Sequence, residues 1–176
     1  EGNMPERNGG MINAPLSYKE FKAQVDALKS GGYLNLTQSV TLENSLTIPK
    51  NVSLLLNGGT VIVPKGKTLT LNGAAELNEG SRLIVEAGGK LILNEQLWVN
   101  RDAKLINNGT VTFGKNSYGE KARIYFAYDQ GNEVIGISHA DQILIIAVDN
   151  FEFPGWKNYK ALFENNDYAG AQLEIW

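Results

Sequence analysis

Apolar residues return at corresponding places along this chain about once every 20–23 residues between Tyr33 and Phe113. Three such columns can be followed: Leu36, Leu56, Leu77 and Val99; Leu42, Val63, Val85 and Leu105; and Ile48, Leu71, Leu93 and Phe113. The runs around them alternate apolar and polar residues, as in Thr68-Leu69-Thr70-Leu71, which is the pattern of a β-strand. Self-similarity at a fixed long period is typical of solenoids, in which each unit stacks on the one before it.

Three columns per repeat describe a coil of three short strands and three corners, and four coils fit the repeated region. Glycines such as Gly66, Gly80 and Gly109 lie where sharp corners are expected. Asn57, Asn78 and Asn100 are spaced 21 and 22, so we expect them to stack as an amide ladder at one corner, with Asn72 and Asn94 as a second ladder. A meander of hairpins would not explain these columns. The sequence therefore predicts an all-β chain whose centre is a single-stranded parallel β-helix.

The inward columns alone bury too few side chains to offset the entropy of ordering the region. We therefore expect a second set of inward residues, two positions away on the same strands. This set is Val40, Leu54, Val61, Leu69, Leu83, Leu91 and Val111.

The N-terminal region predicts a leader and a capping helix. Residues 1–15 are polar, contain Gly and Pro, and show no period, which is typical of a flexible leader. Ser17 and Glu20 have the spacing of a capping box, and Leu16 and Phe21 that of a hydrophobic staple. Gly31-Gly32 ends the predicted helix. Its apolar face, Tyr18, Phe21, Val25 and Leu28, is expected to cover the open end of the first coil.

The last third of the chain, residues 115–176, loses the coil period and becomes rich in aromatic residues. Strands are predicted at 123–128, 133–137 and 143–148, and a short helix at 156–163. We therefore divide the chain into a leader at 1–15, a capping helix with the β-helix at 16–114, and a C-terminal mixed cap or small appended module at 115–176.

The repeated turn glycine, polar residue and Leu-x-Leu pattern resembles that of bacterial extracellular parallel β-helix proteins of pectin-lyase-like architecture. The resemblance covers about the middle half of the chain and contains no functional motif. It implies right-handed coiling, an amphipathic capping helix and export to the cell surface or the extracellular space. The chain begins at Glu1 rather than Met, which fits removal of an upstream segment such as an export signal.

Composition narrows the function classes. The net charge of −3 and the pI near 5.2 provide no attraction for nucleic acid, so no nucleic-acid partner is expected. The longest apolar run, Ile143 to Val148, has the length of one strand, so no membrane span is expected. Without cysteine the chain has no disulfide and no thiolate metal site.

No cofactor or metal motif is present. Gly66-Lys67-Thr68 lacks the first glycine of a phosphate-binding loop and is followed by a strand. His139 is the single histidine, so a histidine metal site is excluded and a solvated turn is the favoured interpretation. Carboxylates and arginines that a polysaccharide lyase or hydrolase would need are confined to predicted corners, where solvated charges are ordinary. These are Asp102 beside Arg101, Glu79 beside Arg82, and Glu86.

Outward apolar residues are the feature that asks for a functional explanation. Alternation places Leu55, Ile62, Ile84, Ile92 and Trp98 on the outside, and we expect Leu55, Ile62, Ile84 and Trp98 to form a continuous apolar strip. Either the C-terminal aromatic segment covers this strip or a partner does. Trp98 is the strongest candidate for ligand contact, because a flat ring suits a sugar face. Tyr125 and Trp156 are further candidates.

These observations predict a noncatalytic, exported surface domain that acts as an adhesive or glycan-contacting module, with a glycan or a surface protein as its partner. A polysaccharide lyase or hydrolase of the pectin-lyase type is the alternative, and a structural spacer is the third interpretation. Carboxylates that converge from adjacent coils would favour the enzyme. An exposed aromatic row would favour binding.

Overall fold

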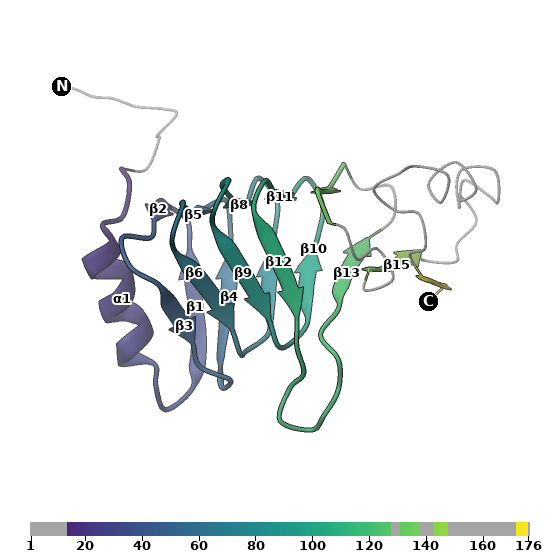
Figure 1. Ribbon diagram of the computed structural model, residues 1–176, viewed down its shortest axis with the longest axis horizontal. Coiled ribbons are helices and arrows are strands. Elements are labelled where there is room, and N and C mark those ends of the chain that lie inside the picture. Colours follow the sequence, from purple (N-terminus) through teal and green to yellow (C-terminus); the bar gives the residue numbers. More distant parts are fainter. Residues whose placement is uncertain (1–13, 128–130, 138–142, 148–171, 176) are drawn as a thin grey trace.

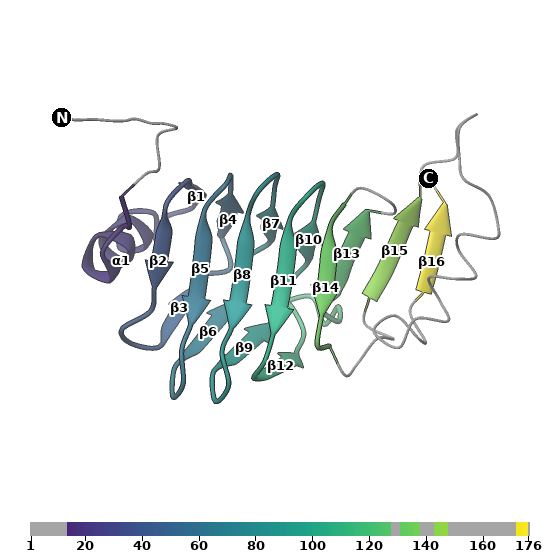
Figure 2. The same cartoon turned by 90° about the horizontal axis from the view of Figure 1, so that it is seen from above.

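The chain forms a parallel β-solenoid of about four turns with one short helix at its N-terminal end (Figures 1 and 2). The computed structural model describes residues 14–127, 131–137, 143–147 and 172–175. Three parallel sheets, here called A, B and C, run along the solenoid, and each of the first four coils contributes one strand to each sheet. The predicted all-β parallel coil architecture is confirmed.

In the first four coils the strands follow one another in the order A, B, C. Sheet A contains β1 (Gly32–Leu36), β4 (Val52–Leu56), β7 (Ala75–Leu77), β10 (Leu97–Val99), β13 (Ile124–Ala127), β15 (Ile143–Ala147) and β16 (Gln172–Ile175). Sheet B contains β2 (Ser39–Thr41), β5 (Thr60–Val63), β8 (Arg82–Val85), β11 (Lys104–Asn107) and β14 (Glu133–Ile135). Sheet C contains β3 (Leu46–Ile48), β6 (Thr68–Leu71), β9 (Lys90–Leu93) and β12 (Thr110–Phe113).

The first and third predicted columns lie in register inside the solenoid. Leu36, Leu56, Leu77 and Val99 are successive partners in sheet A, and all four are buried. Ile48, Leu71, Leu93 and Phe113 are successive partners in sheet C. All seven residues of the second inward set are buried as well. Strand alternation therefore fills the coil interior with aliphatic side chains.

The second predicted column is wrong in its last member. Leu105 pairs with Leu83, and Asn107 is the residue that pairs with Val85. The corners before β8 and β11 have equal length, residues 78–81 and 100–103, so Lys104 aligns with Arg82 and the register follows from there. A shift of two residues leaves Leu105 on the inner face, where it is fully buried.

The N-terminal helix, α1 (Tyr18–Ala27), lies across the first coil (Figure 1). Ser17 caps it, since its Oγ accepts from the Glu20 amide at 3.1 Å. The Glu20 carboxylate accepts from the Ser17 hydroxyl at 2.9 Å, a contact between side chains in addition to the expected cap. Phe21 and Val25 on the inner face are buried, and the Leu16 amide donates to the Ser39 carbonyl at 2.8 Å. The helix therefore covers the apolar end that the first coil would otherwise expose.

Both predicted asparagine ladders are present. Asn100 Nδ2 donates to Asn78 Oδ1 at 2.8 Å, and Asn78 Nδ2 donates to Asn57 Oδ1 at 2.9 Å. Asn57 continues the series to Asn35, which the spacing had not included. At the other corner Asn94 Nδ2 donates to Asn72 Oδ1 at 2.8 Å. The ladders hold successive coils together at corners where the backbone leaves the sheets.

Past residue 114 the strands continue sheets A and B. β13 pairs with β10, β14 pairs with β11, and β15 pairs with β13, all in parallel. Strands are thus found within the three segments predicted at 123–128, 133–137 and 143–148. The predicted leader up to residue 13, the helix at 156–163 and Trp156 lie outside the described residues.

The outer face does not carry the continuous apolar strip that we expected. Leu55 and Trp98 both point outward from sheet A, but Glu76 lies between them in the register. The corner with the asparagine ladder separates that face from sheet B. On sheet B the isoleucines form a longer row than predicted, which contains Ile62, Ile84, Ile106 and Ile135. The outer faces of sheets A and B are therefore two separate surfaces.

Leu77→Asp should prevent cooperative folding, because it places a carboxylate in the dry interior without a partner. We expect a loss above about 4 kcal/mol in the free energy of unfolding, measured by denaturant titration. Leu55→Asp is the matched control, since Leu55 lies on the outer face of the same sheet. It should cost less than about 1 kcal/mol. Equal losses in the two variants would contradict the inward column.

Candidate functional site

One corner of the solenoid is much longer than its equivalents. The corners that lead from sheet C back to sheet A contain three residues in the first three coils, at 49–51, 72–74 and 94–96. The next one, between β12 and β13, contains residues 114–123. It projects from the coils as the long loop between these strands in Figure 1. The seven additional residues, 115–121, are called the corner loop below.

The corner loop leaves the coil and returns to nearly the same point. The Ala122 amide donates to the Gly114 carbonyl at 2.9 Å, and Lys115 and Lys121 form an antiparallel bridge. On either side the ladder bonds of the shorter corners are kept. The Gly114 amide donates to the Leu93 carbonyl at 2.7 Å, and the Arg123 carbonyl accepts from the Leu97 amide at 3.0 Å. The loop is thus an excursion from an otherwise regular corner.

Asn116 organises the corner loop. Its Oδ1 accepts from the backbone amides of Tyr118 and Glu120, both at 2.9 Å. Its Nδ2 donates to Glu120 Oε1 at 2.8 Å and to Glu95 Oε1 at 3.2 Å. Glu95 belongs to the corner of the preceding coil. One amide side chain therefore holds two carboxylates from neighbouring coils next to each other.

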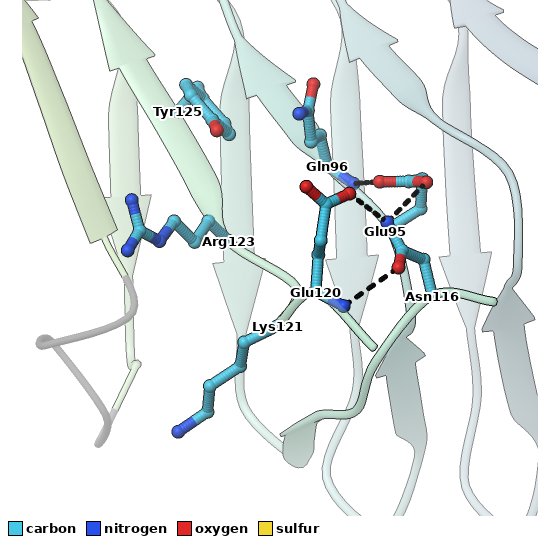
Figure 3. A pocket seen from close by; sticks show the side chains of 7 residues that line it. All are labelled: Glu95, Gln96, Asn116, Glu120, Lys121, Arg123 and Tyr125. Atoms are coloured by element: carbon cyan, nitrogen blue, oxygen red, sulfur yellow. Dashed lines mark hydrogen bonds between the residues drawn. The ribbon is translucent and has the colours of Figure 1, made fainter. Parts of the chain in front are cut away.

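A surface hollow of about 300 Å³ lies between the corner loop and the outer face of sheet A (Figure 3). Its lining is polar apart from one aromatic ring, and consists of Glu95, Gln96, Asn116, Glu120, Lys121, Arg123 and Tyr125. Figure 3 shows the Glu120 carboxylate directed toward Glu95 and Gln96, while Arg123 and Tyr125 stand on the opposite side. The lining thus contains both hydrogen-bond acceptors and hydrogen-bond donors.

Trp98 and Tyr125 form a stacked aromatic pair beside the hollow. They are neighbours in the register of β10 and β13, with ring centroids 4.4 Å apart and planes inclined by 20°. Trp98 Nε1 also donates to Gln96 Oε1 at 3.4 Å. Tyr125 is the ring that lines the hollow, whereas one face of Trp98 is covered by Tyr125. Trp98 therefore stacks against Tyr125, the aromatic wall of the hollow, but does not itself line the hollow.

The corner charges considered in the sequence lie elsewhere. Glu79, Arg101 and Asp102 belong to the corners between sheets A and B, and Glu86 belongs to a corner between sheets B and C. Arg82 is the first residue of β8. The carboxylate residues among them are exposed, and Arg82 is held by the carbonyl oxygens of Ser81 and Asp102 at 2.9 and 3.3 Å. These residues do not line the hollow.

Sequence reasoning missed Glu95, Gln96, Asn116, Glu120 and Arg123. The signal was a change in period, because Val99 pairs with Phe126 at a spacing of 27 instead of 22. A longer spacing predicts an insertion, but it does not say which corner holds it. Among the proposed ligand-contact residues, the structure brings Trp98 and Tyr125 together.

Other site classes gain no support. Within the described residues, no group of three or more Asp, Glu or His side chains is placed to hold a metal ion. Thr68 begins β6, so the Gly66-Lys67-Thr68 segment leads into a strand as predicted. His139 lies outside the described ranges. In the part of the chain that the structure covers, no helix has the length and apolarity needed to cross a membrane.

In comparisons with known proteins, no family model, no curated protein and no solved structure matches this chain. The likeness to parallel β-helix proteins is therefore one of architecture, and function must be argued from the site.

Deleting residues 115–121 should leave a folded protein without the hollow. The remaining Gly114-Ala122-Arg123 corner has the same length as 94–96, and its ends are already hydrogen bonded. We expect cooperative unfolding with a free energy within about 1 kcal/mol of the parent, since a shorter loop costs slightly less entropy to close. Denaturant titration followed by circular dichroism measures this. Deleting 94–96 instead removes a whole corner and should abolish folding. Failure of the 115–121 deletion to fold would show that the loop is structural.

Proposed function

We propose that this chain is a noncatalytic, exported surface module that contacts a glycan with the hollow at the corner loop. The observation that carries the proposal is the stacked Trp98 and Tyr125 pair beside a hollow lined by polar side chains from two adjacent coils. Bacterial extracellular β-helix proteins share this architecture, which supports export. An adhesive role follows if the glycan belongs to a surface.

The chemistry of the hollow suits a sugar. Aromatic side chains offer an apolar surface with a polar tip, and sugar rings have apolar C–H faces between their hydroxyl groups. The Gln96 amide, the Glu120 carboxylate and the Arg123 guanidinium provide both acceptors and donors around one small space. A volume of about 300 Å³ is at the lower end of small-molecule sites. It would accommodate the end of a glycan chain.

Tyr125→Ala should abolish glycan binding and leave the fold intact. The substitution removes the aromatic wall, whereas the coil interior keeps Ile124 and Phe126 on the same strand. A glycan array with the isolated chain, followed by calorimetry with the best ligand, measures the effect. Tyr33→Ala is the matched control, because Tyr33 is an outward tyrosine at the other end of sheet A with 71% of its surface exposed.

Trp98→Ala should weaken binding less than Tyr125→Ala. It should also lower the free energy of unfolding by about 0.5–1.5 kcal/mol through the lost ring stack. Unchanged binding by the Tyr125 variant, or no binding of any glycan by the parent, would reject the proposal and favour a structural spacer.

A polysaccharide lyase or hydrolase remains the second candidate, because two carboxylates converge from adjacent coils. Glu95 and Glu120 each place one oxygen on Asn116 Nδ2, so these oxygens lie at most about 6 Å apart. Such a separation is compatible with a retaining pair, in which the carboxyl groups stand about 5–5.5 Å apart. Both carboxylates are, however, engaged in holding the Asn116 amide. This engagement favours binding over catalysis.

The two functions separate in a turnover assay. We expect prolonged incubation with plant and bacterial polysaccharides to release neither new reducing ends nor unsaturated products. Release that disappears in both Glu95→Gln and Glu120→Gln, and persists in Glu79→Gln, would establish the enzyme. Glu79 is a suitable control because it is an exposed corner glutamate away from the hollow.

A further inference from the structure

We infer that the hollow selects an uncharged glycan end with two adjacent hydroxyl groups, and that the corner loop determines this selectivity. The inference rests on the proposed glycan-contacting function and adds the class of glycan. Its starting point is the balance of charge in the lining, where the two carboxylates of Glu95 and Glu120 stand with the two cations of Lys121 and Arg123.

The charges are separated in space as well as balanced in number. Figure 3 shows Glu95 and Glu120 together on one side of the hollow, Arg123 on the other, and Lys121 directed away from the carboxylates. Adjacent hydroxyl groups match this arrangement, because each hydroxyl both donates and accepts. One can donate to the Glu120 carboxylate while its neighbour accepts from Arg123. Hydrogen bonds with one charged partner are stronger than neutral ones, so this pair would contribute much of the affinity.

Charged sugars fit less well. A uronate would bring a third carboxylate close to Glu95 and Glu120, and like charges in one small site repel each other. A protonated amino sugar would add a third positive charge to a lining that already contains Arg123 and Lys121. An uncharged ring avoids both penalties, and its C–H face can rest against Tyr125.

The corner loop holds the acceptor side in place. Asn116 fixes the Glu120 carboxylate through its amide and the Glu120 backbone through its Oδ1, and the same amide reaches Glu95 in the preceding coil. A side chain that is already ordered loses little entropy when a ligand binds. The three shorter corners between sheets C and A have no such loop. Among these four corners, one site is therefore expected.

The test compares three oligosaccharides that share one linkage and differ in the terminal sugar, which is a neutral hexose, a uronate or an amino sugar. We expect the neutral ligand to bind at least about tenfold more tightly than the other two by calorimetry. Replacing one hydroxyl of the adjacent pair by hydrogen should cost about tenfold or more. Glu120→Gln and Arg123→Gln should each weaken neutral binding about tenfold, while Glu79→Gln leaves it unchanged.

The outcomes distinguish this inference from the function on which it rests. Preference for the uronate, with binding still lost in Tyr125→Ala, would overturn the neutral class and leave glycan binding in place. Neutral binding that survives deletion of residues 115–121 would overturn the role of the corner loop. If none of the three ligands and no glycan on the array binds, both proposals are rejected. Circular dichroism of each variant confirms that the fold is intact.

Discussion

In-register pairing between coils is the constraint on which the rest of the structure depends. Each strand donates and accepts along its length with the equivalent strand of the next coil, so a residue's neighbours are set by the lengths of the corners before it. Leu77 lies between Leu56 and Val99 for this reason, and Asn78 lies between Asn57 and Asn100. The same constraint places Trp98 against Tyr125, although 27 residues separate them. The buried interior, the asparagine ladder and the aromatic pair thus all follow from in-register pairing between coils.

Much of the fold could be predicted because the spacing between repeats indicates which residues pair in neighbouring coils. The alternation around Leu56 and Leu77 reports which side chains point inward, and the spacing of Asn57, Asn78 and Asn100 reports the stacking. The prediction failed where two residues of similar chemistry are not partners in the sheet. Leu105 was matched to Val85 because both are aliphatic, but equal corner lengths bring Asn107 to that position. Apolar matching identifies the inner face reliably, and corner length decides the register.

The site was harder to predict because it lies where the repeat is broken. Glu95 and Gln96 read as ordinary corner residues, and Glu120 and Arg123 fall in a segment without period. What joins them is the insertion of residues 115–121, which brings Asn116 to Glu95 across 21 positions. Trp98 could be identified as outward from alternation alone. The stacking of Tyr125 on one face of Trp98 could not be predicted in this way, because no sequence spacing had shown how β13 pairs with β10.

A regular solenoid also explains why a site would arise at this kind of position. Inside a strand, a single added residue would move every later side chain of that strand to the opposite face. At a corner, an insertion is tolerated when its two ends meet, as the bond between Ala122 and Gly114 shows here. Such a loop lies beside the outer face of a sheet whose side chains are already held by pairing. A new loop and a rigid row of outward residues then form a hollow together, and neither requires a change in the core.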